Sequence, residues 1–156
     1  MSNVTISAPT TTPPAPDIFT AIAGVSGLLP GMAVSWSPNV PGEVVLCSGV
    51  SSSSQVDCCG LVQSTYVNAS GLTIVTVRRG GVLSLSVAQW NAVVVGATTG
   101  LSPGLAAYVA QTTPTAGMLY NGSGIASPGD FIIPVGIAID SLNLQVTMQI
   151  PVTLVA

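Results

Sequence analysis

Short runs in which apolar and polar residues alternate dominate the chain from residue 28 onward. In the clearest run, 142–150, an apolar face that begins at Leu142 alternates with the neutral residues Asn143, Gln145, Thr147 and Gln149. A second run places its apolar residues Phe131, Ile133, Val135, Ile137 and Ile139 on one face. A period of two is typical of half-buried strands, so both runs predict β structure.

The breaks between these runs carry turn residues. Pro-Gly pairs occur at 30–31, 41–42, 103–104 and 128–129, where Pro sets φ and Gly accepts a positive φ. Asp140-Ser141 separates the last two runs and predicts a tight hairpin, while residues 86–92 favour one helical turn. Many short strands with such turns predict an all-β fold, a single compact β-sandwich or β-barrel.

The first 17 residues differ from the rest of the chain. Pro, Thr and Ala dominate them, and no core-forming periodicity occurs. We therefore divide the chain into an extended Pro/Thr-rich arm, 1–17, and a β domain, 18–156. Two interpretations of the arm remain open: a disordered tail, or an arm that lies on a neighbouring subunit through the apolar side chains of Val4 and Ile6.

Charged residues are scarce. The chain of 156 residues has two Lys or Arg, five Asp or Glu and no His, and residues 80–129 carry no formal charge. Catalysis at neutral pH usually needs titratable groups held close together, so we expect no enzyme, no cofactor and no metal site. Arg78 and Arg79 are the only cations, which argues against direct binding to nucleic acid or to anionic membranes.

The uncharged segment 18–41 does not predict a membrane-spanning helix, because Pro30-Gly31 would break it near its middle. The start of the chain also lacks the basic and apolar regions of a secretory signal.

Cys47, Cys58 and Cys59 form an odd set. One interpretation is that they are small buried apolar residues in strands. The alternative is a disulfide from Cys47 to Cys58 or Cys59.

A chain that is 48% hydrophobic and 4% charged cannot cover a monomer with a charged surface. We therefore expect part of the surface to be buried between subunits of an oligomer.

Several motifs in the second half occur together. They are Val87-Ala88-Gln89-Trp90-Asn91-Ala92-Val93, then Gly100-Leu101-Ser102-Pro103-Gly104, then Ala107-Tyr108-Val109, and later Pro134-Val135-Gly136-Ile137-Ala138-Ile139. This order resembles a module of tailed-phage virion proteins, found in head decoration (cement) proteins and in head or tail fibres. Residues 31–77 are similar to small capsid-stabilising β-barrels. The chain departs from the pattern in having Tyr108 alone where the family has two aromatic residues after the Pro-Gly turn.

The resemblance implies a structural virion protein. We expect a capsid decoration protein, made in the host cytoplasm and located on the capsid surface of the virion, where a homotrimer binds the major capsid protein. The alternative is a head-fibre or tail-appendage subunit for attachment or host contact. A carbohydrate-binding β module is disfavoured by the few aromatic residues.

Seven residues are candidates for the interface. Trp and Tyr are enriched at binding hot spots, although each Trp is equally compatible with a core position. The two arginines are candidates for pairing with a partner's carboxylate, or else for a solvated loop. The candidates are Val4, Ile6, Trp36, Arg78, Arg79, Trp90 and Tyr108.

Overall fold

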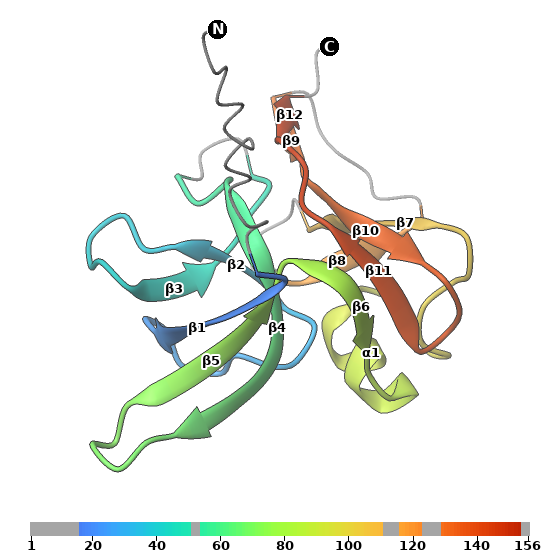
Figure 1. Ribbon diagram of the computed structural model, residues 1–156. Helices are drawn as coiled ribbons and strands as arrows, with labels where there is room; N and C mark the ends of the chain where they lie inside the picture. The colour runs from blue at the N-terminus through green and yellow to red at the C-terminus, as the bar shows by residue number, and fades with distance from the viewer. Residues whose placement is uncertain (1–15, 51–53, 111–115, 123–128, 154–156) are drawn as a thin grey trace, which may run out of the picture.

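A computed structural model describes residues 16–50, 54–110, 116–122 and 129–153 (Figure 1). The regular elements of this part of the chain are twelve β-strands and one short helix, which confirms the all-β class. The elements are β1 (Ile18–Ala23), β2 (Ala33–Trp36), β3 (Glu43–Leu46), β4 (Cys58–Val67), β5 (Thr73–Arg78), β6 (Gly80–Ser84), α1 (Val87–Val93), β7 (Ala106–Val109), β8 (Leu119–Asn121), β9 (Phe131–Ile132), β10 (Pro134–Ala138), β11 (Asn143–Thr147) and β12 (Val152–Thr153).

The first five strands form a closed barrel in the order β1-β3-β2-β4-β5. Antiparallel pairing of β1 with β5 closes it, and β1 and β3 run parallel. Alternation decides which side chains fill the barrel. In β5, for example, Val75 and Val77 are buried while Ile74 and Thr76 are only half-buried. The barrel core is small and rich in valine: Ala21, Leu28, Val34, Val44, Val62, Val75 and Val77.

Five of the seven remaining strands form an open sheet in the order β6-β11-β10-β7-β8, and the other two, β9 and β12, pair with each other (Figure 1). Helix α1 leads from β6 toward β7. Its N-cap Ser86 accepts a hydrogen bond from the backbone of Gln89, whose side chain in turn accepts one from the Ser86 backbone. This capping box explains why the predicted helical turn at 86–92 forms a helix at 87–93.

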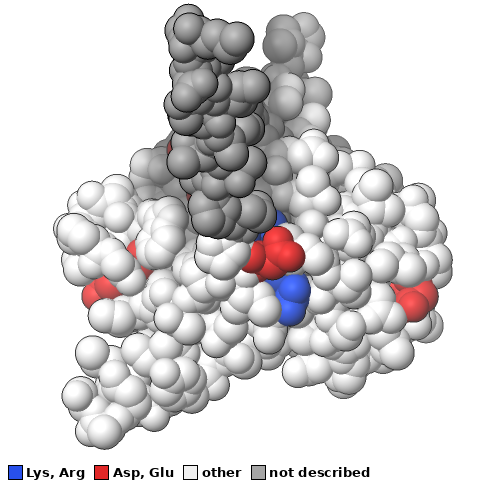
Figure 2. Space-filling model, in the orientation of Figure 1, with Lys and Arg blue, Asp and Glu red and all other residues white. Residues whose placement is uncertain are grey.

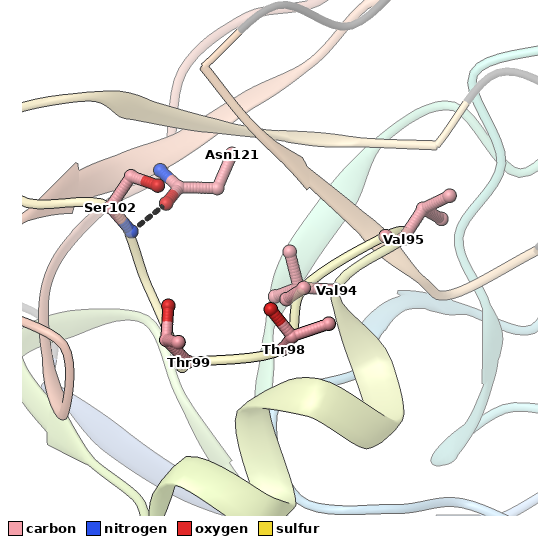
Figure 3. Close-up of a pocket in the computed structure, with 9 residues that line it drawn as sticks. Val94, Val95, Thr98, Thr99, Ser102 and Asn121 are labelled. Atoms are coloured by element: carbon pink, nitrogen blue, oxygen red, sulfur yellow. Dashed lines mark hydrogen bonds between the residues drawn. The ribbon is translucent and has the colours of Figure 1, made fainter.

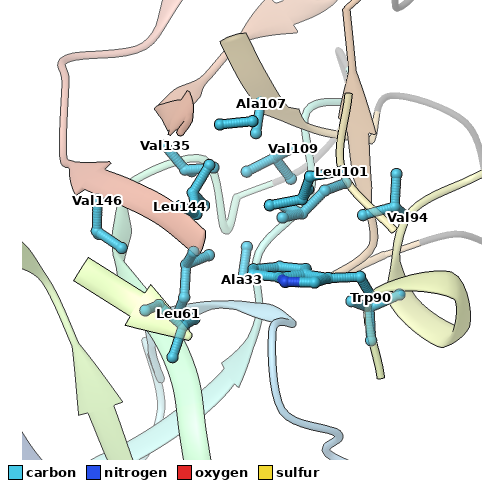
Figure 4. Close-up of a cluster of buried hydrophobic side chains, with 14 of the residues drawn as sticks. Ala33, Leu61, Trp90, Val94, Leu101, Ala107, Val109, Val135, Leu144 and Val146 are labelled. Carbon is cyan, nitrogen blue, oxygen red and sulfur yellow. The ribbon is translucent and has the colours of Figure 1, made fainter. Parts of the chain in front are cut away.

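Barrel and sheet share one large apolar core. Ala33 and Leu61 of the barrel lie in the same buried cluster as Leu144 of the sheet and Trp90 of the helix (Figure 4). The Trp90 side chain is fully buried, and its indole Nε1 donates to the Leu142 carbonyl at 2.8 Å. Of the two interpretations that the sequence allowed for Trp90, a core residue or an interface residue, the structure therefore supports the core residue.

The glycines of all four Pro-Gly pairs have positive φ, as the turn prediction requires. The hairpin predicted at Asp140-Ser141 joins β10 to β11. Asp140 Oδ1 accepts hydrogen bonds from the backbone of Leu142 and Asn143, both at 2.8 Å.

One predicted face is wrong. The run from Phe131 to Ile139 does not keep one face, because the pairing register shifts between Pro134 and Gly136. Ile133 and Val135 are buried, whereas Ile137 and Ile139 are 55% and 53% exposed. The extra residue of a β-bulge reverses the side on which later residues lie.

Strand β1 begins at Ile18, directly after the expected arm. Val4, Ile6 and the rest of residues 1–15 lie outside the described residues, so the arm stays a prediction.

The two tryptophans give a matched test of burial. Trp90→Ala should lower the free energy of unfolding by about 3–5 kcal/mol, because it empties a core position. Trp36→Ala should lower it by about 0.5–1.5 kcal/mol, the contribution of one aromatic pair. Urea denaturation followed by circular dichroism measures both, and equal effects would contradict the assignment of Trp90 to the core.

Candidate binding surface

An exposed aromatic pair lies on the barrel. Trp36 ends β2 with 49% of its surface exposed, and its ring stacks on Phe19 of β1 with centroids 5.1 Å apart and planes at 25°. Phe19 is half-buried and packs against the barrel core. The stacked ring holds Trp36 in place, so a partner could bury it without first ordering a free side chain.

A second exposed apolar surface lies on the open sheet. Gln145 of β11 pairs with Val82 of β6 on one side and with Ile137 of β10 on the other. The Ile139 backbone N–H donates to the Asn143 carbonyl at 2.8 Å, which extends the same surface by one row. We call Val82, Ile137, Ile139, Asn143 and Gln145 the neutral face. Its five side chains are branched apolar groups and neutral amides, and the Asp140 carboxylate, which accepts from the Asn143 amide, borders it.

The two arginines differ in what they can offer a partner. The half-buried Arg78 donates from Nε to Gln63 Oε1 at 3.0 Å and from Nη1 to the Gly80 carbonyl at 3.2 Å. Arg79 is exposed, and its backbone N–H donates to the Asp17 carbonyl at 2.8 Å. Figure 2 shows blue and red atoms together at one spot near the centre, a few red atoms apart from them at the left and the right, and an otherwise white described surface. Arg78 is thus held within the chain, and Arg79 is the more available cation.

Tyr108 lies in β7, half-buried, and pairs with Tyr120 of β8 and with Pro134 of β10. The interface candidates therefore fall on separate elements: Trp36 on the barrel, Arg78 and Arg79 between barrel and sheet, and Tyr108 in the sheet. Sequence reasoning missed Phe19 as the partner of Trp36, and it missed Ile137 and Ile139 as exposed residues, because the bulge leaves no clear sequence signal.

The three cysteines are free thiols. A hydrogen bond from the Cys58 thiol lowers the pKa of Cys47, while that hydrogen bond and burial raise the pKa of Cys58. Burial, with the nearby Cys47, raises the pKa of Cys59 to about 12. Since the thiolate is the reactive form, Cys58 and Cys59 are poor nucleophiles. The interpretation of these residues as small packed side chains agrees with their positions against the two cores.

A small polar hollow lies beside the loop that follows α1 (Figure 3). It encloses about 220 Å³ and is lined by residues 94–100, Ser102 and Asn121. Asn121 Oδ1 accepts from the Ser102 backbone, and its Nδ2 donates to the carbonyls of Leu105 and Ala106, both at 3.2 Å. The lining has hydroxyls but no titratable side chain, so the hollow can hydrogen-bond a neutral group and has no acid or base for chemistry.

Among the described residues, no three His, Cys, Asp or Glu side chains gather closely enough to hold a metal ion. The Asp140 carboxylate instead receives the Asn143 side-chain amide at 2.7 and 2.9 Å. No helix in the described ranges is both long and apolar enough to cross a membrane.

No known family model matches the chain, and comparisons with curated proteins and with solved structures found no match.

The hairpin carboxylate gives a pH prediction. Hydrogen bonds from the Asn143 side chain, and then from the Leu142 backbone, hold the pKa of Asp140 below its ordinary value of 3.8. A pKa that is lower in the folded state contributes stability at neutral pH, and this contribution is lost as pH falls through the folded value. Asn143→Ala should therefore raise the pKa of Asp140, measured by NMR titration. Gln145→Ala on the same strand serves as control, and an unchanged Asp140 in the Asn143 variant would contradict this account.

Proposed function

We propose that the chain is a structural protein of a phage-like particle, which binds the assembled capsid as an oligomer and stabilises it. The observation that carries the proposal is the combination of exposed apolar side chains with an almost charge-free surface. Such a surface suits permanent contact with other proteins better than contact with water. The resemblance of the motifs around Trp90, Pro103-Gly104 and Tyr108 to virion modules supports the same class.

Magnitudes favour apolar contacts over ion pairs at this surface. An exposed ion pair contributes about 0–1 kcal/mol, whereas full burial of one large apolar side chain contributes about 1.5–3 kcal/mol. Arg78 already donates to Gln63 and Gly80, which leaves Arg79 as the more available cation. Trp36 and the neutral face are therefore the contacts that we expect to hold the major capsid protein.

The mechanism is thermodynamic. A ligand that binds only the assembled shell stabilises that shell by mass action, by about 2.7 kcal/mol per site when its free concentration is 100 times Kd. Many sites on one particle add their contributions, and several contacts per trimer slow dissociation. The chain needs no catalytic group for this function.

Binding to particles tests the proposal. Purified chain mixed with empty, expanded capsids should co-sediment with them and raise the temperature at which they come apart. Binding at a portal, tail or host receptor and not on the shell would favour the alternative of a head-fibre or tail-appendage subunit. No binding to any virion part would contradict both.

The response to salt tests the kind of contact. Occupancy on capsids should change little between low salt and about 1 M sodium chloride, where charges are screened within about 3 Å but apolar burial is not weakened. Trp36→Ala should lower occupancy more than Arg79→Ala does, with far-UV dichroism showing that both variants fold. Release by moderate salt, together with loss of binding in Arg79→Ala, would mean that the rare charges hold the complex.

A further inference from the structure

Strand β6 has an open edge. Among the strands that the structure describes, it pairs only with β11, with Val82 opposite Gln145 and Ser84 opposite Asn143. In the same register, the Leu85 N–H donates to the Leu142 carbonyl at 3.0 Å. Because backbone bonding alternates along an antiparallel pair, Val82 and Ser84 direct their N–H and C=O groups away from β11.

These outward groups have no backbone partner within the described ranges, and both residues are exposed. Strand β6 contains no charged residue and no Pro. Exposed edge strands usually carry such residues, which block pairing with another chain. Unpaired backbone groups in a row are a template for one more strand.

A groove of about 260 Å³ runs beside this edge. Its walls are Val82, Leu83 and Ser84 on the side of β6, and Gln63 and Arg78 on the side of the barrel. The Arg78 guanidinium donates to the carbonyl of Gly80, which occupies the first outward acceptor of β6. The outward N–H and C=O groups of Val82 and Ser84 remain unpaired within the described ranges. An added strand would therefore pair with these two residues.

We propose that residues 4–7 of a second copy of the chain occupy this groove as an additional strand on β6. The segment Val4-Thr5-Ile6-Ser7 alternates β-branched apolar residues with hydroxyl residues and has no Pro, no Gly and no charge. It therefore matches both the open ladder and the neutral, partly apolar walls.

The length of the arm indicates that the donor is another copy. The Asp17 carbonyl accepts the Arg79 N–H, so each arm leaves its own protomer at the start of β6. Residues 8–16 include Pro9, Pro13, Pro14 and Pro16. A Pro-rich segment of nine residues extends about 28 Å, whereas the five residues of β6 span about 17 Å. Because that reach exceeds the length of the chain's own β6 edge, residues 4–7 can reach the edge of a neighbouring copy, and we assign the donated strand to that copy.

The contact is head-to-tail, since each copy donates one arm and accepts another. Such a contact generates a ring when the rotation closes, and three copies would give the expected trimer. This inference rests on the oligomer of the proposed function but not on its capsid partner.

Two variants separate arm from edge. Removing residues 2–8 deletes the donated strand. Val82→Pro removes the outward N–H of the acceptor, and it breaks no bond to β11 because that N–H points the other way. Light scattering after size exclusion should show a trimer for the full chain and monomers for both variants, while Val82→Ala, which keeps the N–H, stays trimeric. Far-UV dichroism and urea midpoints establish that the monomers are folded.

Mixing the two variants gives the sharpest test. The Val82→Pro chain still has an arm and the shortened chain still has an edge, so the mixture should form a 1:1 dimer that neither forms alone. In the full-length trimer the amides of Val82 and Ser84 should exchange with solvent about tenfold or more slowly than in the shortened chain.

Three outcomes would overturn the inference. A trimer that survives loss of residues 2–8 would show that other contacts join the copies. A full-length monomer with protected Val82 and Ser84 amides would show that the arm pairs with its own edge. The third outcome is a shortened chain that still forms a trimer and still binds capsids, and that stops binding capsids when Val82→Pro is added. That result would assign the groove to a strand of the capsid protein. Failure to bind capsids by an arm-dependent trimer would contradict the proposed function alone.

Discussion

The apolar core shared by barrel and sheet is the constraint on which the rest of the structure depends. The barrel has little to bury by itself, since its interior is filled mainly by valines, and most of the large cluster comes from the sheet and α1. Ala33 and Leu61 contribute to the larger cluster from the barrel, and Trp90 enters it from the helix. The hydrogen bond from the Trp90 indole to Leu142 satisfies the one polar atom of that side chain and links α1 to the β10–β11 hairpin.

That core has a consequence for the surface. Large apolar side chains are used inside, yet Trp36, Ile137, Ile139 and Val82 remain outside, and few charges surround them. A closed barrel removes the exposed edges of its own strands, but the open sheet keeps β6 as an edge. The exposed apolar groups and the unprotected edge are the basis of both proposals, in which contact with other chains covers them.

Several polar and titratable groups of the described residues serve packing and backbone geometry. The raised pKa values of Cys58 and Cys59 keep these thiols protonated, the Asp140 carboxylate organises a hairpin, and Arg78 lines a groove beside β6. Each rare polar or charged group acts on backbone positions and packing. Under both proposals a partner is recognised by shape and by strand pairing, with specificity set by where the apolar side chains and open backbone groups lie.

The sequence by itself determined the all-β class, the Pro-Gly turns, the capped helical turn at Ser86 and the hairpin at Asp140, because each depends on residues within a few positions of one another. Only the tertiary structure decided that Trp90 is internal and Trp36 external, since a tryptophan in a helical turn or at the end of a strand suits either a core or an interface. It also decided that Ile137 and Ile139 face outward, because the bulge at Pro134–Gly136 arises from pairing with β7. The edge of β6 and its groove depend on strands distant in sequence, and local patterns carry no information about which strand is left unpaired.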